Sequence, residues 1–210
     1  MKLALFGATG GTGQQLLDQA LAAGHHVTAI VRDPTRLRRP DRPGLDVVTA
    51  ELTDANAIGA GVTGQDAVVS TLGPRPGAGG SVCADGARAI MTAMRATATR
   101  RLIVVTAGGH IVDEGDGPLN RALVKPLLRR LLREGFADFA RTDEAVLSSG
   151  LDWTIMRPPR LTDGERRPYR TAIDRNVRRG ITIARADLAH AILAALAEPA
   201  TVGHSISLGY

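Results

Sequence analysis

The sequence predicts an α/β protein with a doubly wound, mainly parallel sheet, built as a single domain over residues 1–210. Short apolar segments alternate along the chain with longer segments of helical periodicity, which is the pattern of βαβ units. No internal repeat or low-complexity tract interrupts this alternation. Stretches rich in glycine and proline at 74–80 and 108–118 follow predicted strands, so we interpret them as loops beside a site.

The predicted strands are short apolar runs, and the predicted helices have apolar residues at every third or fourth position. Strands are expected at Lys2–Phe6, His26–Val31, Leu45–Thr49, Asp66–Thr71, Arg101–Thr106 and Asp152–Met156, with an edge strand at His204–Leu208. Helices are expected at Thr12–Ala23, Ser81–Ala98, Asp138–Ser149 and Arg185–Leu196, and a short helix follows Thr53 as its N-cap. The region 160–179 shows no clear pattern.

The composition bears on partners and location. The chain has 26 basic and 21 acidic residues and a net charge of +5, yet its arginines are scattered and aromatic residues make up only 3%. Without a basic cluster or a stacking platform, we do not expect nucleic-acid binding. The one cysteine, Cys83, fits a reducing cytoplasm, and neither a signal peptide nor an apolar run of roughly 20 residues is found. We expect a cytoplasmic monomer or weak homodimer that does not bind membranes and whose partner is a small molecule.

A glycine-rich turn follows the first predicted strand, with Gly7, Gly10 and Gly13 in GxxGxxG spacing. Glycine lets a diphosphate approach the backbone, and the helix that follows offers free N–H groups and the positive end of its dipole. Thr9 and Thr12 add hydroxyl donors. A strand before the turn and a helix after it predict a Rossmann-type dinucleotide site, whereas a tight turn without a ligand is the alternative.

The end of the second predicted strand bears on which dinucleotide binds. NAD-binding proteins usually place a carboxylate there to bind the ribose hydroxyls. This chain has Arg32 at that position and Arg36 one helical turn later, and guanidinium groups suit a 2′-phosphate. Asp33 is the competing ribose ligand, but the following Pro34 is typical of a helix that Asp33 caps. The pattern favours NADP(H) over NAD(H).

The other strand ends supply further candidates, because ligands of open α/β sheets bind beyond the carboxyl edge. These candidates are Thr53, Asp54, Leu72, Gly73, Thr106, Ala107 and Pro158 to Arg160. Asp54 could bind the adenine amino group, or it could be a carboxylate in the first turn of its helix.

The acid–base pair of classical short-chain dehydrogenases is absent from the sequence. Those enzymes have a tyrosine four residues before a lysine, whereas Tyr169 is followed at that distance by Ile173, and Tyr210 is the last residue. Ordinary carbonyl reduction needs such a proton donor. We keep His110, in the loop after the fifth strand, as a candidate donor, and we expect His190 to pack in the core. The histidines and the cysteine show no metal-ligand spacing.

Together these motifs resemble the atypical short-chain dehydrogenase/reductase group, which includes NmrA-like proteins and, more closely, the biliverdin reductase B/flavin reductase family. The resemblance covers nearly the whole chain and rests on GATGGTG, VRDPTRL, GQDAVVSTLG, SGLDWTIMRPPRLTD and ARADLAHAIL. It implies a Rossmann fold that binds NADPH and transfers hydride from the nicotinamide to a flavin or, in some members, to biliverdin.

The resemblance also implies roles for matching positions. The phosphate positions of the family match Gly7, Thr9, Gly10, Gly11 and Thr12. The 2′-phosphate positions match Arg32 and Arg36, and the nicotinamide positions match Leu72, Gly73, Thr106 and Pro158.

Two positions depart from the reducing relatives. Ala107 stands where they have a serine, and Arg160 stands where they have a histidine. These changes disfavour biliverdin reduction. Flavin reduction is affected less, because water can supply the remaining proton. Arg160 is expected either to pair with an anionic group such as a flavin phosphate or to face solvent.

The sequence therefore predicts an NADPH-dependent reductase of a flavin (FMN or FAD), a quinone or a similar planar conjugated acceptor. Thr106, Arg160 and His110 are the candidate catalytic residues. The alternative is a non-catalytic NADP(H)-binding regulator or redox sensor of NmrA-like type. The substrate side is expected around 108–135 and 158–185.

A basic helical segment lies within this substrate side. Arg121, Lys125, Arg129 and Arg133 recur every four residues beside a stripe of leucines. We interpret the basic residues as a solvated face over a core stripe. A lid over the site, or contact with an acidic partner or a membrane surface, is the alternative.

Overall fold

The centre of the protein is an eight-stranded sheet with the strand order β3-β2-β1-β4-β5-β6-β10-β8. The computed structural model describes residues 1–74, 80–113, 116, 122 and 125–210. The strands of this sheet are β1 (Lys2–Phe6), β2 (His26–Val31), β3 (Leu45–Thr49), β4 (Ala67–Ser70), β5 (Arg101–Val105), β6 (Asp152–Arg157), β8 (Arg170–Ile173) and β10 (His204–Gly209). All neighbouring strands are parallel except β10 and β8. The predicted mainly parallel sheet is confirmed.

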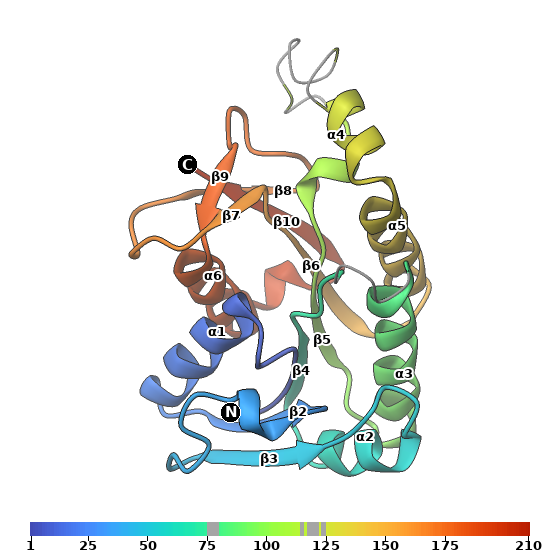
Figure 1. The fold of residues 1–210 in the computed structure, drawn as a ribbon, viewed down its shortest axis with the longest axis vertical. Coiled ribbons are helices and arrows are strands. Elements are labelled where there is room, and N and C mark those ends of the chain that lie inside the picture. Colours follow the sequence, from blue (N-terminus) through green and yellow to red (C-terminus); the bar gives the residue numbers. More distant parts are fainter. Residues whose placement is uncertain (75–79, 114–115, 117–121, 123–124) are drawn as a thin grey trace.

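Helices cover both faces of this sheet (Figure 1). One face carries α1 (Gly11–Ala22) and α6 (Arg185–Ala197), which pack against each other. The other face carries α2 (Ala55–Val62), α3 (Val82–Ala96) and α5 (Arg133–Leu147). The helix α4 (Lys125–Leu131) precedes α5, and β7 (Arg160–Thr162) pairs in parallel with β9 (Thr182–Ala184) outside the main sheet. Among the described residues, 3₁₀ turns lie at η1 (Pro34–Arg36), η2 (Gly108–His110) and η4 (Pro199–Thr201).

Successive residues of β1 face opposite sides of the sheet. Leu3 and Leu5 pack with the apolar side chains of α1 and α6, whereas Ala4 and Phe6 pack with those of α2, α3 and α5. Because both faces are covered, most positions along such a strand are apolar, and the strand is a nearly continuous apolar run in the sequence. The two cores hold the carboxyl edge of the sheet in place beneath the loops that follow it.

Three details of the predicted elements are wrong. The strand expected at the edge, His204–Leu208, lies inside the sheet, because β8 pairs with β10 on its outer side. The residues of β8 are mostly exposed, so the sequence lacks a core pattern there. The N-cap of α2 is Asp54, whose carboxylate accepts a hydrogen bond from the Ala57 N–H at 3.0 Å, and not Thr53. Finally, α5 begins at Arg133 rather than at Asp138.

The basic helical segment differs from its sequence interpretation. It is divided between α4 and α5. Arg133 is exposed as expected, but the exposure expected for Lys125 and for three leucines is wrong. Lys125 is buried, whereas Leu127, Leu131 and Leu132 are 56%, 71% and 51% exposed. The segment projects beyond the sheet, so no core covers these leucines (Figure 1). Arg121 and the side chain of Arg129 lie outside the described part of the chain.

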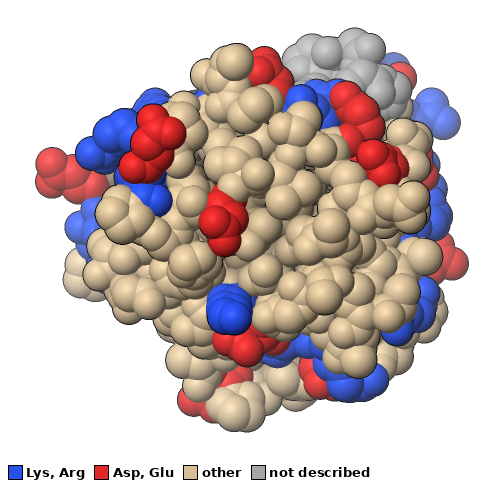
Figure 2. Space-filling model, turned by 90° about the horizontal axis from the view of Figure 1, so that it is seen from below, with Lys and Arg blue, Asp and Glu red and all other residues tan. Residues whose placement is uncertain are grey.

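Charged side chains of both signs are interspersed on the face of the molecule seen in Figure 2. Uncharged side chains lie between them, so the described residues form no continuous basic patch on this face. This agrees with the scattered arginines of the sequence. None of the described helices combines the length and apolar character needed to cross a membrane.

Candidate functional site

A cleft of about 550 Å³ lies at the carboxyl edge of the sheet, where the strand order reverses between β1 and β4. Open α/β sheets bind ligands at such a switch point because the loops on its two sides diverge. We call it the switch-point cleft. Its lining includes these residues predicted from the sequence: Gly7, Thr9, Gly10, Gly11, Thr12, Arg32, Thr53, Leu72, Gly73 and Thr106.

Close packing explains two glycines of the turn between β1 and α1. Gly7 has a φ of 81°, and a Cβ there would lie 2.7 Å from Thr71 Oγ1. A Cβ at Gly13 would lie only 2.1 Å from the carbonyl oxygen of Gly7. Only glycine therefore lets α1 begin this close to the turn, with its first residues facing the cleft.

The first turn of α1 lacks a cap. Its N-cap residue, Gly10, makes no side-chain hydrogen bond, and the turn contains no acidic residue. Such an N-terminus leaves N–H groups without partners and presents the positive end of the helix dipole. The start of α3, by contrast, is capped by buried Asp138, whose carboxylate accepts from the N–H groups of Cys83 and Ala84 at 2.8 and 3.0 Å. Of these two helices, α1 is the one whose N-terminus is available to an anion.

Cys83 lies beside the capped start of α3. Burial raises the pKa of the Cys83 thiol far above its usual value, and the nearby Asp138 carboxylate adds to the increase. A thiol that stays protonated is a poor nucleophile, so its burial does not favour Cys83 as a nucleophile.

At the end of β2, the two candidate ribose-side residues, Arg32 and Asp33, have different surroundings. Arg32 is exposed and lines the switch-point cleft. Asp33 caps η1, because its carboxylate accepts hydrogen bonds from the Thr35 N–H at 3.1 Å and from the Thr35 hydroxyl at 2.6 Å. The hydrogen bond from the Thr35 hydroxyl lowers the pKa of Asp33. The N-cap interpretation of Asp33 is confirmed, while Arg36 lies on η1, exposed and outside the cleft lining.

The loop after β3 adds polar side chains at the same end of the cleft. Thr53 lines the cleft together with Glu51, an exposed carboxylate that the sequence patterns do not single out. Asp54 lies outside the lining and is engaged as the cap of α2. Its proposed contact with adenine stays a prediction.

Thr106 marks the opposite end of the switch-point cleft, where Leu72 and Gly73 also lie. The Thr106 side chain is 3% exposed, and its Oγ1 has no hydrogen-bond partner among the described residues. A buried hydroxyl without a partner costs about 1–3 kcal/mol. A ligand that bonded to this hydroxyl would therefore be stabilised at this end of the cleft.

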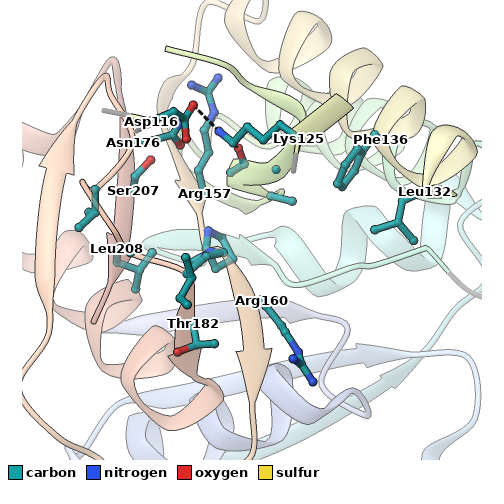
Figure 3. A pocket seen from close by; sticks show the side chains of 18 residues that line it. Asp116, Lys125, Leu132, Phe136, Arg157, Arg160, Asn176, Thr182, Ser207 and Leu208 are labelled. Carbon is teal, nitrogen blue, oxygen red and sulfur yellow. Dashed lines mark hydrogen bonds and ion pairs between the residues drawn. The ribbon is translucent and has the colours of Figure 1, made fainter. Parts of the chain in front are cut away.

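A second cavity, of about 650 Å³, begins at Ala107, directly after Thr106 in the chain. We call it the side cavity, and it includes the predicted residues Ala107, Pro158 and Arg160. Phe136 and Leu132 line its helical side, and Leu208 and Thr182 lie across from them (Figure 3). Both segments expected to form the substrate side contribute to its walls.

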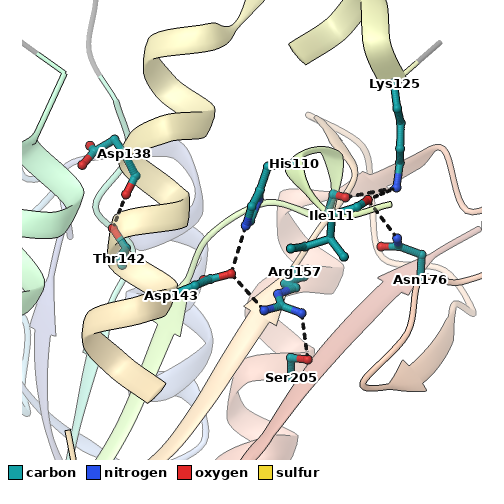
Figure 4. Close-up of polar contacts among 10 residues, drawn as sticks. His110, Ile111, Lys125, Asp138, Thr142, Asp143, Arg157, Asn176 and Ser205 are labelled. Atoms are coloured by element: carbon teal, nitrogen blue, oxygen red, sulfur yellow. Dashed lines mark hydrogen bonds and ion pairs between the residues drawn. The ribbon is translucent and has the colours of Figure 1, made fainter. Parts of the chain in front are cut away.

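A buried ion pair closes one end of the side cavity. Lys125 Nζ lies 2.6 Å from Asp116 Oδ2, and both side chains are less than a tenth exposed. The same ammonium donates to the carbonyl oxygens of Gly108 and Ile111, and Asn176 Nδ2 donates to Asp116 Oδ2 at 3.2 Å (Figures 3 and 4). These contacts join η2, the start of α4 and the loop after β8, and all three segments line the cavity.

His110 belongs to a different network, behind the side cavity. Its Nε2 lies 2.9 Å from Asp143 Oδ2, which also accepts from Arg157 at 2.9 Å, and Arg157 donates to Ser205 Oγ at 3.0 Å (Figure 4). Arg157 lines the side cavity, whereas His110 lines neither it nor the switch-point cleft. This position does not favour His110 as a proton donor, and its catalytic role stays an untested prediction. Likewise His190 is half-buried and bonded to Tyr169 at 2.8 Å.

Several lining residues were not predicted, and the most informative is Arg185. It is the first residue of α6 and lines the switch-point cleft. An arginine at a helix N-terminus opposes the helix dipole, so its position in the sequence carries a signal of function. Arg157 and Asn176 in the side cavity carry no such signal, because tertiary contacts alone bring them there. Among the described residues, no group of three or more histidine, cysteine or acidic side chains could hold a metal ion.

Comparison with known proteins gives one family match and several relatives. The model of the family described as NAD(P)H-binding matches residues 7–199. Uncharacterized protein YwnB of Bacillus subtilis is 30% identical over 172 residues, covering 78% of this chain and 74% of YwnB. Reductase pytE of Aspergillus terreus is 26% identical over 239 residues, covering 89% of this chain and 88% of pytE.

Solved structures show the same fold. A short-chain dehydrogenase/reductase of Veillonella parvula in complex with NADP has a TM-score of 0.83 at 21% identity, covering 100% of this chain and 94% of that chain. ChuY, an anaerobillin reductase of Escherichia coli O157:H7, has a TM-score of 0.81 at 23% identity, covering 99% of this chain and 96% of ChuY. The predicted Rossmann fold is thereby confirmed.

Proposed function

The chain belongs to the NAD(P)H-binding family, with atypical short-chain dehydrogenase/reductase proteins as structural neighbours, and from this premise we propose that it is an NADPH-dependent reductase. The acceptor would be a flavin, a quinone or a similar planar conjugated molecule, reduced by direct hydride transfer. The family assignment gives a nicotinamide cofactor, and the reductase pytE among the relatives supports an oxidoreductase.

The observation that carries the proposal is the junction of two cavities at Thr106 and Ala107. The switch-point cleft ends there at a hydroxyl that has no partner in the described part of the chain, and the side cavity begins there with largely apolar walls. A cleft for the dinucleotide next to a separate cavity for an acceptor is what hydride transfer between two bound molecules requires.

The residues of the cleft fit a dinucleotide. The uncapped start of α1 suits the diphosphate, and Arg32 suits a 2′-phosphate. When bound, the reduced nicotinamide would supply the hydride. The chain would hold both partners: Thr106 would offer its hydroxyl at the junction, and apolar residues such as Phe136 and Pro158 would exclude water.

The positions of the tyrosines support a reaction without a dedicated proton donor. Tyr169 is bonded to His190 at 2.8 Å, and the Tyr210 hydroxyl accepts from the Ala184 N–H at 2.9 Å. Neither tyrosine lines the switch-point cleft or the side cavity. This favours acceptors such as flavins and quinones, which can take their remaining proton from water.

The test is steady-state oxidation of NADPH with FMN, FAD, riboflavin and quinones. Turnover with one of these acceptors is the expected result, and tight NADPH binding without any turnover would contradict the reductase. That second outcome would favour a non-catalytic NADP(H)-binding regulator, which the absent acid–base pair motivates.

The same assay can test whether Arg160 binds an anionic group of the acceptor. It is exposed, lines the side cavity, and would pair with a flavin phosphate. We expect Arg160→Ala to raise the KM for FMN about tenfold and to leave that for riboflavin, which lacks the phosphate, unchanged. An unchanged KM for FMN would remove Arg160 from the site.

A further inference from the structure

We propose that Arg185 is a diphosphate-binding residue of the cofactor site, and that Asp163 competes with the dinucleotide for it. The inference rests on the dinucleotide part of the proposed function and does not depend on the acceptor. Arg185 would add a cation that the glycine motif does not contain. Binding of the dinucleotide would then break the ion pair between Arg185 and Asp163 and form one between Arg185 and the diphosphate.

The pairing of β7 with β9 brings the two residues together. Thr162 lies opposite Ala184 in this parallel pair, so the residues that follow, Asp163 and Arg185, leave the two strands side by side. Their side chains form an ion pair, with Arg185 NH1 2.6 Å from Asp163 Oδ1. Arg185 is also the first residue of α6, which anchors its backbone to the core.

The side chain of Arg185 crosses the glycine turn. Its Cδ and Nε lie 2.8 Å from the point that a Cβ on Gly11 would occupy, so the absence of a side chain at Gly11 makes room for it. Arg185 lines the switch-point cleft together with Gly10, Gly11 and Thr12. A guanidinium thus lies at the uncapped start of α1, where helix amides and the dipole already favour an anion.

The existing partner of Arg185 is easily displaced. The Asp163 side chain is 87% exposed and that of Arg185 is 29% exposed, and ion pairs of exposed groups contribute little stability. A phosphate held by the helix amides would offer the guanidinium a charge-assisted hydrogen bond in a less hydrated position. A positive charge at the N-terminus of α6 opposes the helix dipole and destabilises the helix slightly. Binding of a ligand phosphate by Arg185 would explain why the chain has an arginine at this position.

The proposal predicts opposite effects for the two members of the pair. Arg185→Gln is expected to weaken NADP⁺ and NAD⁺ binding about tenfold each, because both dinucleotides carry the diphosphate. Asp163→Asn is expected to tighten both about threefold, because the guanidinium is released from its competitor. In the Arg185→Gln background, Asp163→Asn should have no effect on affinity, since its target is gone.

Isothermal titration calorimetry of the purified chain with each dinucleotide measures these affinities. Glu165→Gln is the matched control: it removes one negative charge from the same loop, and Glu165 forms no ion pair with Arg185. Wild-type affinity of the Arg185→Gln variant for both dinucleotides would overturn the proposal. So would an increase in dinucleotide affinity in Glu165→Gln as large as that in Asp163→Asn. If the wild-type chain bound neither dinucleotide, the proposed function would fail first, so the two failures are distinguishable.

Discussion

The switch-point cleft and the side cavity adjoin each other but are built in different ways. The centre of the cleft is one continuous turn, whose glycines and first helical residues line it, with further strand ends around that turn. The side cavity takes its residues from segments far apart in the chain, and buried ionic contacts such as that of Lys125 with Asp116 hold those segments together. A site made of backbone imposes a pattern on the sequence, whereas a site made of distant side chains does not.

Gly13→Ala is the strongest test of the backbone-built cleft. The added Cβ would lie 2.1 Å from the Gly7 carbonyl oxygen, so the turn or the helix must move. We expect a loss of about 3 kcal/mol or more in the free energy of unfolding, together with at least a tenfold loss of NADP⁺ affinity. Urea unfolding and calorimetry measure the two effects.

The matched control is Gly59→Ala in α2, where an added Cβ meets no atom within 4 Å. Alanine is the better helix former, so this variant should gain about 0.5–1 kcal/mol of stability and keep its affinity. Wild-type behaviour of Gly13→Ala would show that the turn tolerates a side chain.

Lys125→Met tests the side cavity by the same two measurements, the free energy of unfolding and the NADP⁺ affinity. The change leaves the buried Asp116 carboxylate without its cation, and breaking a buried pair in this way costs about 3 kcal/mol or more. We expect easier unfolding in urea, while NADP⁺ affinity stays within about twofold because Lys125 does not line the cleft. The control is Lys2→Met, at the other lysine of the chain, which is exposed. It should change the free energy of unfolding by less than about 0.5 kcal/mol. A fall in NADP⁺ affinity as large as that of Gly13→Ala would mean that the two regions are not separate.

Arg32→Ser asks how far the cleft depends on a side chain. If Arg32 binds the 2′-phosphate, losing a charge-assisted contact of about 2 kcal/mol should weaken NADP⁺ roughly 30-fold and leave NAD⁺ unchanged. Competition binding with the two dinucleotides measures the ratio. Arg36→Ser, outside the cleft lining, should have the smaller effect. Equal losses for NADP⁺ and NAD⁺ in Arg32→Ser would contradict the 2′-phosphate assignment.

Cys83 gives the smallest expected effect, which depends on pH. Burial raises the pKa of its thiol in the folded chain, so above the ordinary value of 9.0 the unfolded chain releases a proton that the folded chain keeps. The folded state therefore loses stability as pH rises above 9, by at most about 1.4 kcal/mol per pH unit. Urea unfolding between pH 8 and 10 should show a steeper decline in the wild type than in Cys83→Ala. Parallel declines would mean that the thiol titrates normally.

The difference between the cleft and the side cavity also explains how much of the candidate site could be predicted from the sequence. Gly7, Gly10 and Thr12 belong to one local motif, and the structure brings them into the cleft as expected. In the side cavity, Ala107, Pro158 and Arg160 were predicted as strand-end residues, and the rest only as two broad segments, because Lys125 and Asn176 come together through tertiary contacts that no local spacing encodes. The edge strand was misplaced for a related reason: β8 is exposed, and so it lacks the apolar run by which the buried strands are recognised.

If the uncapped start of α1 holds part of a dinucleotide, binding there would also affect the lifetime of the protein. A ligand that binds only the folded chain raises the free energy of unfolding by about 2.7 kcal/mol at a hundredfold excess over Kd. Without the ligand this contribution is lost, so the chain spends a larger fraction of the time unfolded and open to proteases. We expect cells depleted of the dinucleotide to degrade this protein faster than replete cells, so that its abundance follows the supply of its ligand.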